Sequence, residues 1–182
     1  MINQSGKKAT VINLYGGPGC GKSTAAAYIF AKLKMVGVSC ELVTEFAKDK
    51  TWENNSKALH CQPYVFGEQC YRMDRCADQV DVIITDSPLL LSALYNEDKD
   101  LEPEFTKIVI KKFNTFTNYN FFLKRWKKYC NIGRLQTEEQ AIEIDNKIKS
   151  MLTSNKISFD EVEGRSDGFE EIIYRVRNLI GK

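Results

Sequence analysis

Apolar residues along the chain cluster in short runs that alternate with longer amphipathic segments. The short runs are rich in β-branched and aromatic residues, which is typical of β-strands. They occupy residues 10–15, 40–44, 81–86, 119–123 and 157–162. The third run is nearly continuous in apolar residues, as expected of a central strand that is buried on both faces. Strands that alternate with helices predict a parallel sheet with helices packed against it.

The segments between these runs carry helix signals. Gly37 could end a first helix, Pro103 and Glu104 suit the first turn of another, and residues 137–140 form a capping box. Helices are therefore expected at residues 22–35, 64–79, 137–152 and 167–180, with one more beginning at 103–104. Together these elements predict a single domain over residues 1–182, with a three-layer α/β/α fold and a five-stranded, mainly parallel sheet.

Composition and charge exclude few functions. The chain has 182 residues, of which 43% are hydrophobic and 27% charged, as in ordinary globular proteins, and its net charge of +2 says little about partners. No apolar run approaches the roughly 20 residues that a membrane helix needs. Residues 1–8 also lack the apolar stretch of a signal peptide. We therefore expect a cytoplasmic protein that does not act at a membrane.

The six cysteines include no CxxC pair. In a reducing compartment they are expected to be free thiols. His60 and Cys61 are adjacent, but the chain has only one histidine and no second group of ligands. No metal site is therefore expected at this pair.

A glycine-rich segment follows the first predicted strand and precedes the first predicted helix. Residues 16–23 match the pattern G-x-x-x-x-G-K-[ST], and a strand before with a helix after is the context that this phosphate-binding motif requires. Its glycines let backbone N–H groups point at phosphate oxygens, and the helix N-terminus adds partial positive charge. Lys22 could then reach the β- and γ-phosphates of ATP, and the Ser23 hydroxyl could bind Mg²⁺. The residues expected to contact the nucleotide are Gly16, Gly17, Pro18, Gly19, Cys20, Gly21, Lys22, Ser23 and Thr24.

Two acidic residues end predicted strands. Asp86 lies at the carboxyl edge of the sheet, where open α/β sheets bind ligands, and is a candidate Mg²⁺ ligand. The alternative is that it caps the turn before Pro88. Glu45 ends the second strand and could act as a general base that accepts a proton from a substrate hydroxyl. The alternative is a strand-end charge in solvent.

Polar residues also share one face of the predicted helix at 64–79. Gln69 and Arg72 are three residues apart, and Arg75 continues their face. Such a face could bind substrate by recognising a base edge and a phosphate. It could equally be a polar outer surface.

The segment from residue 105 to residue 137 contains no acidic residue. Its later half follows the fourth strand, and a basic lid is expected at about 124–136. Arg125 and Arg134 are the candidates for contacting the transferred phosphate, although either could be an ordinary surface charge. Aromatic residues interleave the cations, which suits a polyanion whose bases stack; the alternative is that Phe121 and Phe122 are buried and the cations serve ATP alone.

These motifs together resemble small P-loop kinases of the nucleoside and nicotinamide-riboside kinase type. The resemblance rests on the glycine loop, on residues 43–48 (VTEFAK), on Gln69 with Arg72, and on residues 83–88 (IITDSP). Residues 129–141 (YCNIGRLQTEEQA) are similar to a bacteriophage branch, nearest to the 5-hydroxymethyluridine DNA kinases. One departure is that Ser87-Pro88 follow Asp86, where deoxynucleoside kinases usually have an Asp-Arg pair.

The resemblance implies a nucleoside-kinase-like P-loop NTPase fold with ATP and Mg²⁺ as cosubstrates. It further implies transfer of the γ-phosphate to the hydroxymethyl group of 5-hydroxymethyluracil in phage DNA, during thymidine hypermodification in the infected host cytoplasm. Two alternatives stay open. One is a kinase for a free nucleoside, nucleotide or nicotinamide riboside, and the other is a P-loop ATPase or nucleotide switch that acts with a protein partner. The predicted lid and Glu45 favour a kinase over a switch.

Overall fold

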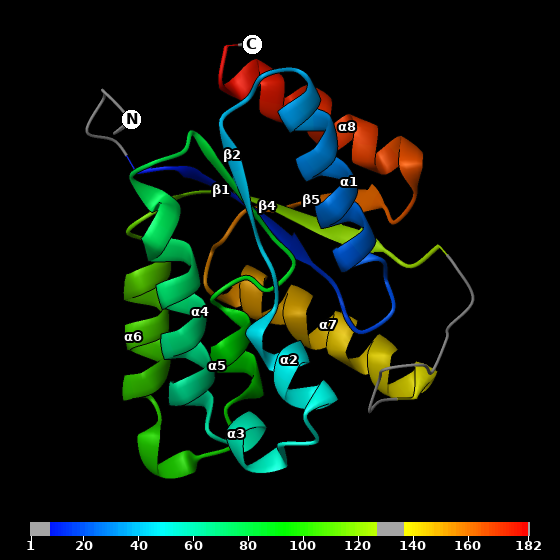
Figure 1. The fold of residues 1–182 in the computed structure, drawn as a ribbon. Helices are drawn as coiled ribbons and strands as arrows, with labels where there is room; N and C mark the ends of the chain where they lie inside the picture. The colour runs from blue at the N-terminus through cyan, green and yellow to red at the C-terminus, as the bar shows by residue number, and fades with distance from the viewer. Residues whose placement is uncertain (1–7, 127–136, 182) are drawn as a thin grey trace.

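Five parallel strands form a single sheet in the computed structural model, which describes residues 8–126 and 137–181 (Figure 1). The order across the sheet is β2-β3-β1-β4-β5, and every neighbouring pair is parallel. The expected parallel sheet is therefore confirmed. The strands are β1 (Thr10–Tyr15), β2 (Cys40–Val43), β3 (Val82–Thr85), β4 (Thr117–Lys124) and β5 (Asp160–Glu163).

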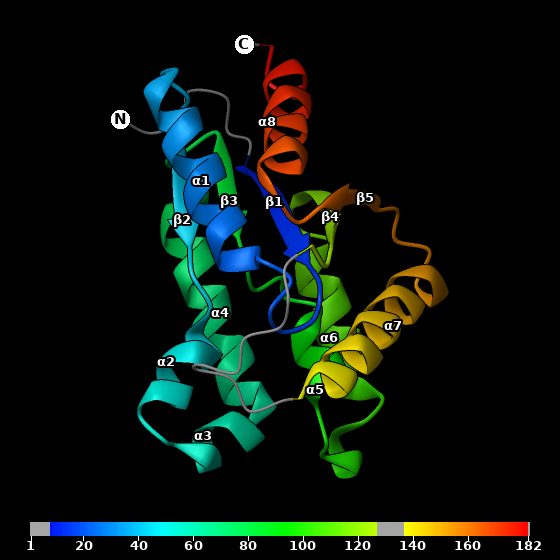
Figure 2. The same ribbon diagram turned by 90° about the vertical axis from the view of Figure 1, so that its right-hand side faces the viewer.

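Helices cover both faces of this sheet, which gives the expected three layers (Figure 2). One face carries α1 (Lys22–Met35) and α8 (Ser166–Leu179). The opposite face carries α4 (Gln62–Ala77), α5 (Leu91–Tyr95), α6 (Glu104–Phe113) and α7 (Glu138–Ser154). Shorter elements follow β2 and α5, namely α2 (Phe46–Trp52), α3 (Ser56–His60) and the 3₁₀ helix η1 (Lys99–Leu101).

Side chains of the central strand β1 point alternately to the two faces of the sheet and so belong to both halves of the core. Ile12 and Leu14 face α1 and α8, whereas Val11 and Tyr15 face the four helices on the other side. All four side chains are buried. Because strand side chains alternate between faces, the four apolar residues of β1 let it pack against both helical layers.

Asn13 is the buried polar residue of β1, and its amide has hydrogen-bond partners. Its Nδ2 donates to Asn118 Oδ1 at 2.9 Å and to Asn120 Oδ1 at 3.1 Å, both on β4. Asn120 in turn donates to the carbonyl oxygen of Ser158. A row of amides therefore ties β1 to β4 at modest cost, since a buried polar group is destabilising only when it lacks a partner.

The capping box predicted at the start of α7 is present. Thr137 accepts a hydrogen bond from the backbone of Gln140, and the Gln140 side chain accepts one from the Thr137 backbone. None of the described helices is long and apolar enough to cross a membrane.

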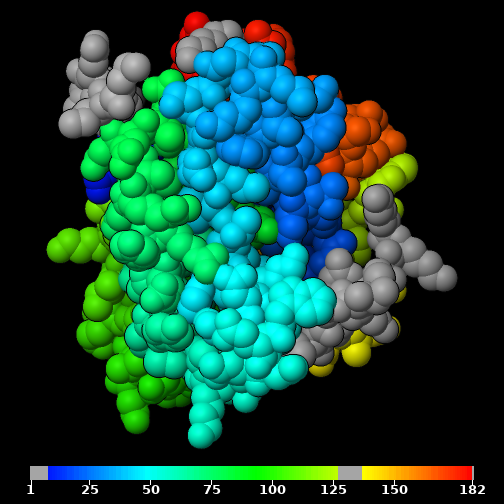
Figure 3. All heavy atoms as spheres, in the orientation of Figure 1, coloured from blue at the N-terminus to red at the C-terminus, as the bar shows by residue number. Residues whose placement is uncertain are grey.

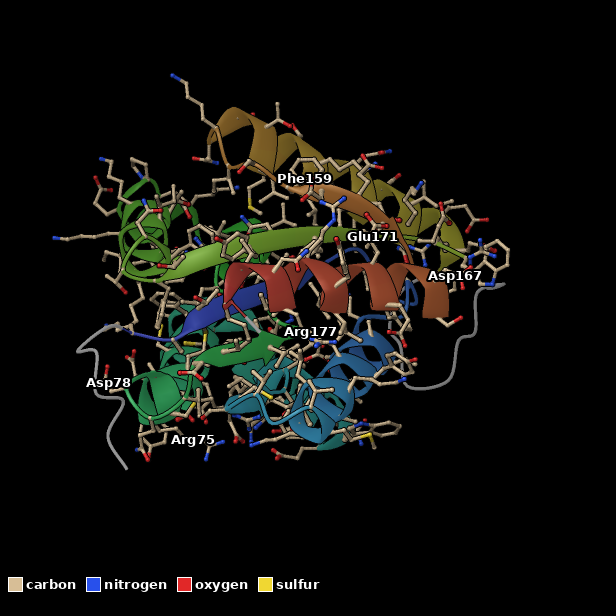
Figure 4. The ribbon with its side chains drawn as sticks, turned by 90° about the horizontal axis from the view of Figure 1, so that it is seen from above. Arg75, Asp78, Phe159, Asp167, Glu171 and Arg177 are labelled. Atoms are coloured by element: carbon tan, nitrogen blue, oxygen red, sulfur yellow. The ribbon has the colours of Figure 1, made fainter. Side chains whose placement is uncertain are left out.

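Most aromatic residues of the acid-free segment at 105–137 belong to the core. Phe113, Phe116, Phe121 and Phe122 are all buried. Phe159 packs with its ring 6.3 Å from that of Phe122 (Figure 4). The alternative that Phe121 and Phe122 are buried strand residues is therefore confirmed, and none of these four rings is available to stack on bases.

Candidate functional site

The glycine loop connects β1 to α1 at the carboxyl edge of the sheet. Gly16, Gly19 and Gly21 have positive φ angles of 139°, 83° and 102°, a region that L-residues with a Cβ rarely adopt. Gly21 is the N-cap of α1, and no side chain caps the helix there. The first backbone N–H groups of a 14-residue helix therefore face the loop without a side-chain acceptor. This arrangement fits an anion such as a phosphate group.

Lys22 lies folded across this loop. Its Nζ donates to the carbonyl oxygens of Gly16 at 2.6 Å and Gly17 at 3.1 Å. Burial by itself lowers the pKa of Lys22, but nearby acidic groups outweigh burial and the pKa is raised. Lys22 is therefore a cation held at the phosphate loop. In order of effect, the groups that raise its pKa are Cys20, Glu45, Tyr95 and Asp86.

Glu45 and Asp86 meet at the carboxyl edge of the sheet, where β2 and β3 end side by side. The backbone N–H of Glu45 donates to Asp86 Oδ1 at 3.1 Å, and Asp86 is only 3% exposed. Burial raises the pKa of the Glu45 carboxyl, Lys22 lowers it and Asp86 raises it further. The net effect is a raised pKa, which makes Glu45 a stronger base than an ordinary glutamate at the same edge.

The oxygen groups at this edge also suit Mg²⁺. Ser23 and Thr24 are exposed at the start of α1, and Asp86 contributes a carboxylate from β3. Mg²⁺ prefers hard oxygen ligands and is usually bound by one or two protein groups together with substrate phosphates. Ser23 and Asp86 could hold the ion, which would neutralise charge on the phosphates.

Gln69 is buried under the turn that carries Glu45. Its Oε1 accepts from the backbone N–H of Phe46 at 3.0 Å, and its Nε2 donates to the Thr44 carbonyl oxygen at 3.3 Å. Gln69 is 2% exposed, so both ends of its amide are used inside the protein. In this structure Gln69 holds the β2–α2 turn in place.

Arg72 lies beside the same turn, one helical turn along α4. Its guanidinium donates to the Asp49 carboxylate and lies over the Phe46 ring at 5.1 Å. Arg75, by contrast, lies near the end of α4 with Asp78 (Figure 4), and the chain then leads into the amino end of β3. Arg75 nevertheless continues the face of Arg72, because both residues line one pocket together with Val43 and Thr44 at the carboxyl end of β2.

Replacing Gln69 with leucine is expected to lower both stability and any activity that depends on Glu45. Leucine fills similar space but leaves the Phe46 N–H and the Thr44 carbonyl without their partner, which costs about 1–3 kcal/mol. Urea unfolding of Gln69→Leu beside Gln79→Leu, an exposed glutamine just past α4, measures the difference. Equal unfolding midpoints for the two variants would show that Gln69 does not stabilise the turn.

Arg125, at the end of β4, is joined to the glycine loop. Its Nη1 donates to the Pro18 carbonyl oxygen at 2.6 Å, and its Nη2 donates to Asp145 Oδ2 on α7 at 2.8 Å. The structure thus brings Arg125 to the phosphate loop, and its contact with a transferred phosphate stays a prediction. Arg134, the second lid candidate, lies outside the described residues.

Other cations of the acid-free segment are paired with carboxylates from elsewhere. Lys107 pairs with Glu104, Lys112 with Asp74 and Lys124 with Glu163. The absence of acidic residues in the sequence of this segment therefore does not leave a uniformly positive surface in the fold.

Two residues at the site were not predicted. Burial raises the pKa of Tyr95 at the end of α5, and the charges of Lys22, Glu45 and Asp145 also act on it. Asp145 accepts a hydrogen bond from the Gly17 N–H through Oδ1. The five-residue α5 has too few positions for a helical pattern, and nothing in the sequence of α7 distinguishes Asp145 from its other acidic residues.

Comparison with known proteins gives a family match over most of the chain. A model of the AAA domain family matches residues 11–171. Among curated proteins, none is significantly similar to the chain in sequence. Solved structures with a similar fold include that of APE1195, at 15% identity and a TM-score of 0.46 over 96% of each chain. They also include thymidylate kinase from Candida albicans, at 12% identity and a TM-score of 0.48 over 96% of this chain and 92% of that one.

The structure and the family match agree. The chain has a glycine loop with a lysine folded across it and a parallel sheet covered by helices on both faces, and the family match spans residues 11–171. The chain is a P-loop nucleotide-binding domain, and it belongs to the AAA domain family.

Proposed function

We propose that this protein is an ATP-dependent kinase that transfers the γ-phosphate to an alcohol group. The observation that carries the proposal is the meeting of Lys22, Glu45 and Asp86 at one edge of the sheet, with the pKa of Glu45 raised beside a cationic lysine. A domain that only binds nucleotide needs the lysine and a metal ligand. A base beside them is what transfer to a hydroxyl requires.

Each residue then has a stated part in the reaction. Glu45 accepts the proton of the acceptor hydroxyl as its oxygen forms a bond to the γ-phosphorus, and the bond from that phosphorus to the β–γ bridging oxygen breaks to release ADP. Lys22 and the loop N–H groups stabilise negative charge on the β- and γ-phosphates. Mg²⁺, bound through Ser23 and Asp86, would add further charge neutralisation. Arg125 and Arg134 are proposed to contact the phosphates from the β4 side.

As acceptor we propose a 5-hydroxymethyl pyrimidine in DNA, which places the protein in thymidine hypermodification of a phage genome. This part rests on the resemblance of residues 129–141 to a bacteriophage branch of small P-loop kinases, nearest to the 5-hydroxymethyluridine DNA kinases. Gln69 and Arg72 would serve binding of this substrate by fixing the turn that presents Glu45, with Arg72 the more exposed of the two.

A kinase for a free nucleoside, nucleotide or nicotinamide riboside is the second candidate. Two observations favour it, namely the burial of four aromatic rings that could have stacked on DNA bases and the pairing of Lys107, Lys112 and Lys124 with carboxylates. A small acceptor needs neither an aromatic surface nor a basic one.

The acceptor is tested with γ-labelled ATP, Mg²⁺ and parallel substrates. These are DNA containing 5-hydroxymethyluracil, DNA of the same sequence with thymine, free 5-hydroxymethyl-2′-deoxyuridine, and a set of nucleosides that includes nicotinamide riboside. The DNA proposal predicts label on hydroxymethyluracil DNA alone, because thymine lacks the acceptor hydroxyl. Label confined to free nucleosides would replace it with the second candidate, and label in no acceptor would leave neither kinase proposal standing.

A further inference from the structure

Hydrogen bonds with Asp145 and Arg125 hold the first half of the glycine loop. Asp145 on α7 accepts from the Gly17 N–H through Oδ1 and from Arg125 through Oδ2, while Arg125 donates to the Pro18 carbonyl oxygen. One carboxylate and one guanidinium thus contact the backbone of two successive loop residues. We refer to Asp145 and Arg125 below as the loop bracket.

The loop bracket is largely removed from solvent. The side chains of Arg125 and Asp145 are only 13% and 16% exposed. Removing one partner of such a pair leaves an uncompensated charge in poor contact with water, which costs more than removing both partners together. The two residues are therefore expected to behave as a unit.

The approach of α7 to the loop is close enough to require glycine at position 17. A Cβ built there would lie 2.5 Å from the Ala141 carbonyl oxygen and 2.9 Å from Asp145 Oδ1. Burial raises the pKa of Tyr95, Lys22 lowers it, and the charges of Glu45 and Asp145 raise it further. Asp145 is therefore both packed on the loop and electrostatically connected to the candidate site.

An isolated carboxylate here would oppose the function of the loop. A triphosphate carries negative charge, and a negative side chain hydrogen-bonded to the loop would repel it. Arg125 neutralises that charge at 2.8 Å and is itself turned toward the loop by the same contact.

From these contacts we infer that Asp145 is a positioning residue for nucleotide binding, which acts by holding Arg125 and the Gly17 backbone in the geometry that accepts phosphates. The inference rests on the proposed function only as far as ATP binding at the glycine loop. It does not depend on the acceptor or on transfer.

The test is a double-mutant cycle on nucleotide affinity. Fluorescent-analogue competition gives the Kd of ATP and of adenosine for the wild type, Arg125→Met, Asp145→Asn and the double variant. Arg125→Met is expected to weaken ATP binding on the order of 100-fold, because it leaves the Asp145 charge unpaired at the loop. Asp145→Asn keeps an acceptor for the Gly17 N–H and is expected to weaken ATP binding about 10-fold.

The inference is tested by whether the effects of the two substitutions on ATP affinity are smaller together than the product of the single effects. The double variant is expected to bind ATP about 10-fold more tightly than Arg125→Met, because the unpaired carboxylate is gone, while adenosine affinity stays the same in all four proteins. Glu143→Gln removes an exposed carboxylate of the same helix and is the matched control, expected to match the wild type.

Two results would overturn the positioning role. One is a double variant whose loss of ATP affinity equals the product of the single losses, and the other is Asp145→Asn binding ATP more tightly than the wild type. If Asp145→Asn does not fold, Asp145→Glu keeps the charge and must bind ATP more tightly than Arg125→Met. If no protein in the series, wild type included, binds ATP, the proposed function fails first, and the two failures are thereby distinguished.

Discussion

Replacing Lys22 with alanine is expected to reduce phosphoryl transfer at least on the order of 10³-fold, the upper end of what removing one preorganised charge-stabilising group costs. Lys22 is the cation that lies across the glycine loop, 2.6 Å and 3.1 Å from two of its carbonyl oxygens. Its removal also acts on Glu45, because Lys22 lowers the pKa of that carboxyl. Without Lys22 the pKa of Glu45 rises further, and less of the base is ionised at neutral pH.

Lys34→Ala provides the control for this substitution. Lys34 is an exposed lysine near the other end of the same helix. Replacing it changes the net charge by the same amount and removes a lysine from α1, but it does not alter the glycine loop. Transfer rates at saturating ATP, with thermal melts to establish folding, make the comparison. A Lys22→Ala protein that is folded and retains more than a tenth of the wild-type rate would contradict the role assigned to the loop.

Replacing Glu45 with glutamine is expected to lower kcat about 10²- to 10⁴-fold, the usual contribution of a positioned general base. Glutamine preserves the size of the side chain but cannot accept the acceptor proton. In the wild type, kcat/KM should rise with pH through the raised pKa of Glu45 and then level off. In Glu45→Gln that acidic limb should disappear, which the pH profile of kcat/KM measures directly.

The same substitution is expected to stabilise the fold at neutral pH. Because the folded pKa of Glu45 is raised above its ordinary value of 4.5, the folded state binds this proton more tightly than the unfolded chain. That contribution to stability is fully present below pH 4.5 and is lost as the pH rises through the folded pKa. At pH 7 the ionised carboxylate therefore costs stability, and Glu45→Gln should unfold at a higher urea concentration than the wild type.

Glu53→Gln serves as the matched change in the exposed residue just past α2. It should leave kcat and the pH profile unaltered and move the unfolding midpoint only slightly, since its pairing with Lys50 is at the surface. If Glu45→Gln kept the wild-type turnover or the acidic limb, Glu45 would not be the base.

The buried strands and the longer helices of this fold could be predicted from the sequence. The apolar run at 10–15 coincides with β1, the helix expected at 22–35 coincides with α1, and the capping box at Thr137 begins α7. These elements are either deeply buried or marked by a local hydrogen-bonding motif, so the pattern of residues carries the information. The helices α2, α3 and α5 have five to seven residues, and such short segments show no measurable periodicity.

Part of the candidate site could also be predicted from the sequence, and part of it could not. The glycine loop is a contiguous motif with a fixed backbone requirement, so its geometry follows from residues 16–23 alone. The roles of Gln69 and Asp145 depend on contacts across 25 and 128 positions of the chain, and no local pattern records such contacts. Burial of Phe121 and Phe122 was likewise left open, because alternation in a short strand does not show which elements will cover it.

Activity is expected at the carboxyl edge of the sheet, where the strands end. In the view of Figure 3, α1 and α4 flank the edge strand β2, and α2 lies beyond its carboxyl end, so the β2–α2 turn carrying Glu45 borders the open end of the sheet. This arrangement places Glu45, the proposed base, at the same end of the sheet as the glycine loop.

Following the γ-phosphate of labelled ATP tests transfer at this site most directly. With the acceptor identified in the substrate panel, label bound to the acceptor is separated from inorganic phosphate and both are quantified over time for the wild type and Lys22→Ala. A phosphotransferase predicts label on the acceptor hydroxyl well in excess of inorganic phosphate in the wild type, and neither product with Lys22→Ala. Release of inorganic phosphate alone, at a rate that no acceptor changes, would contradict the account and identify the site as that of an ATPase or nucleotide switch.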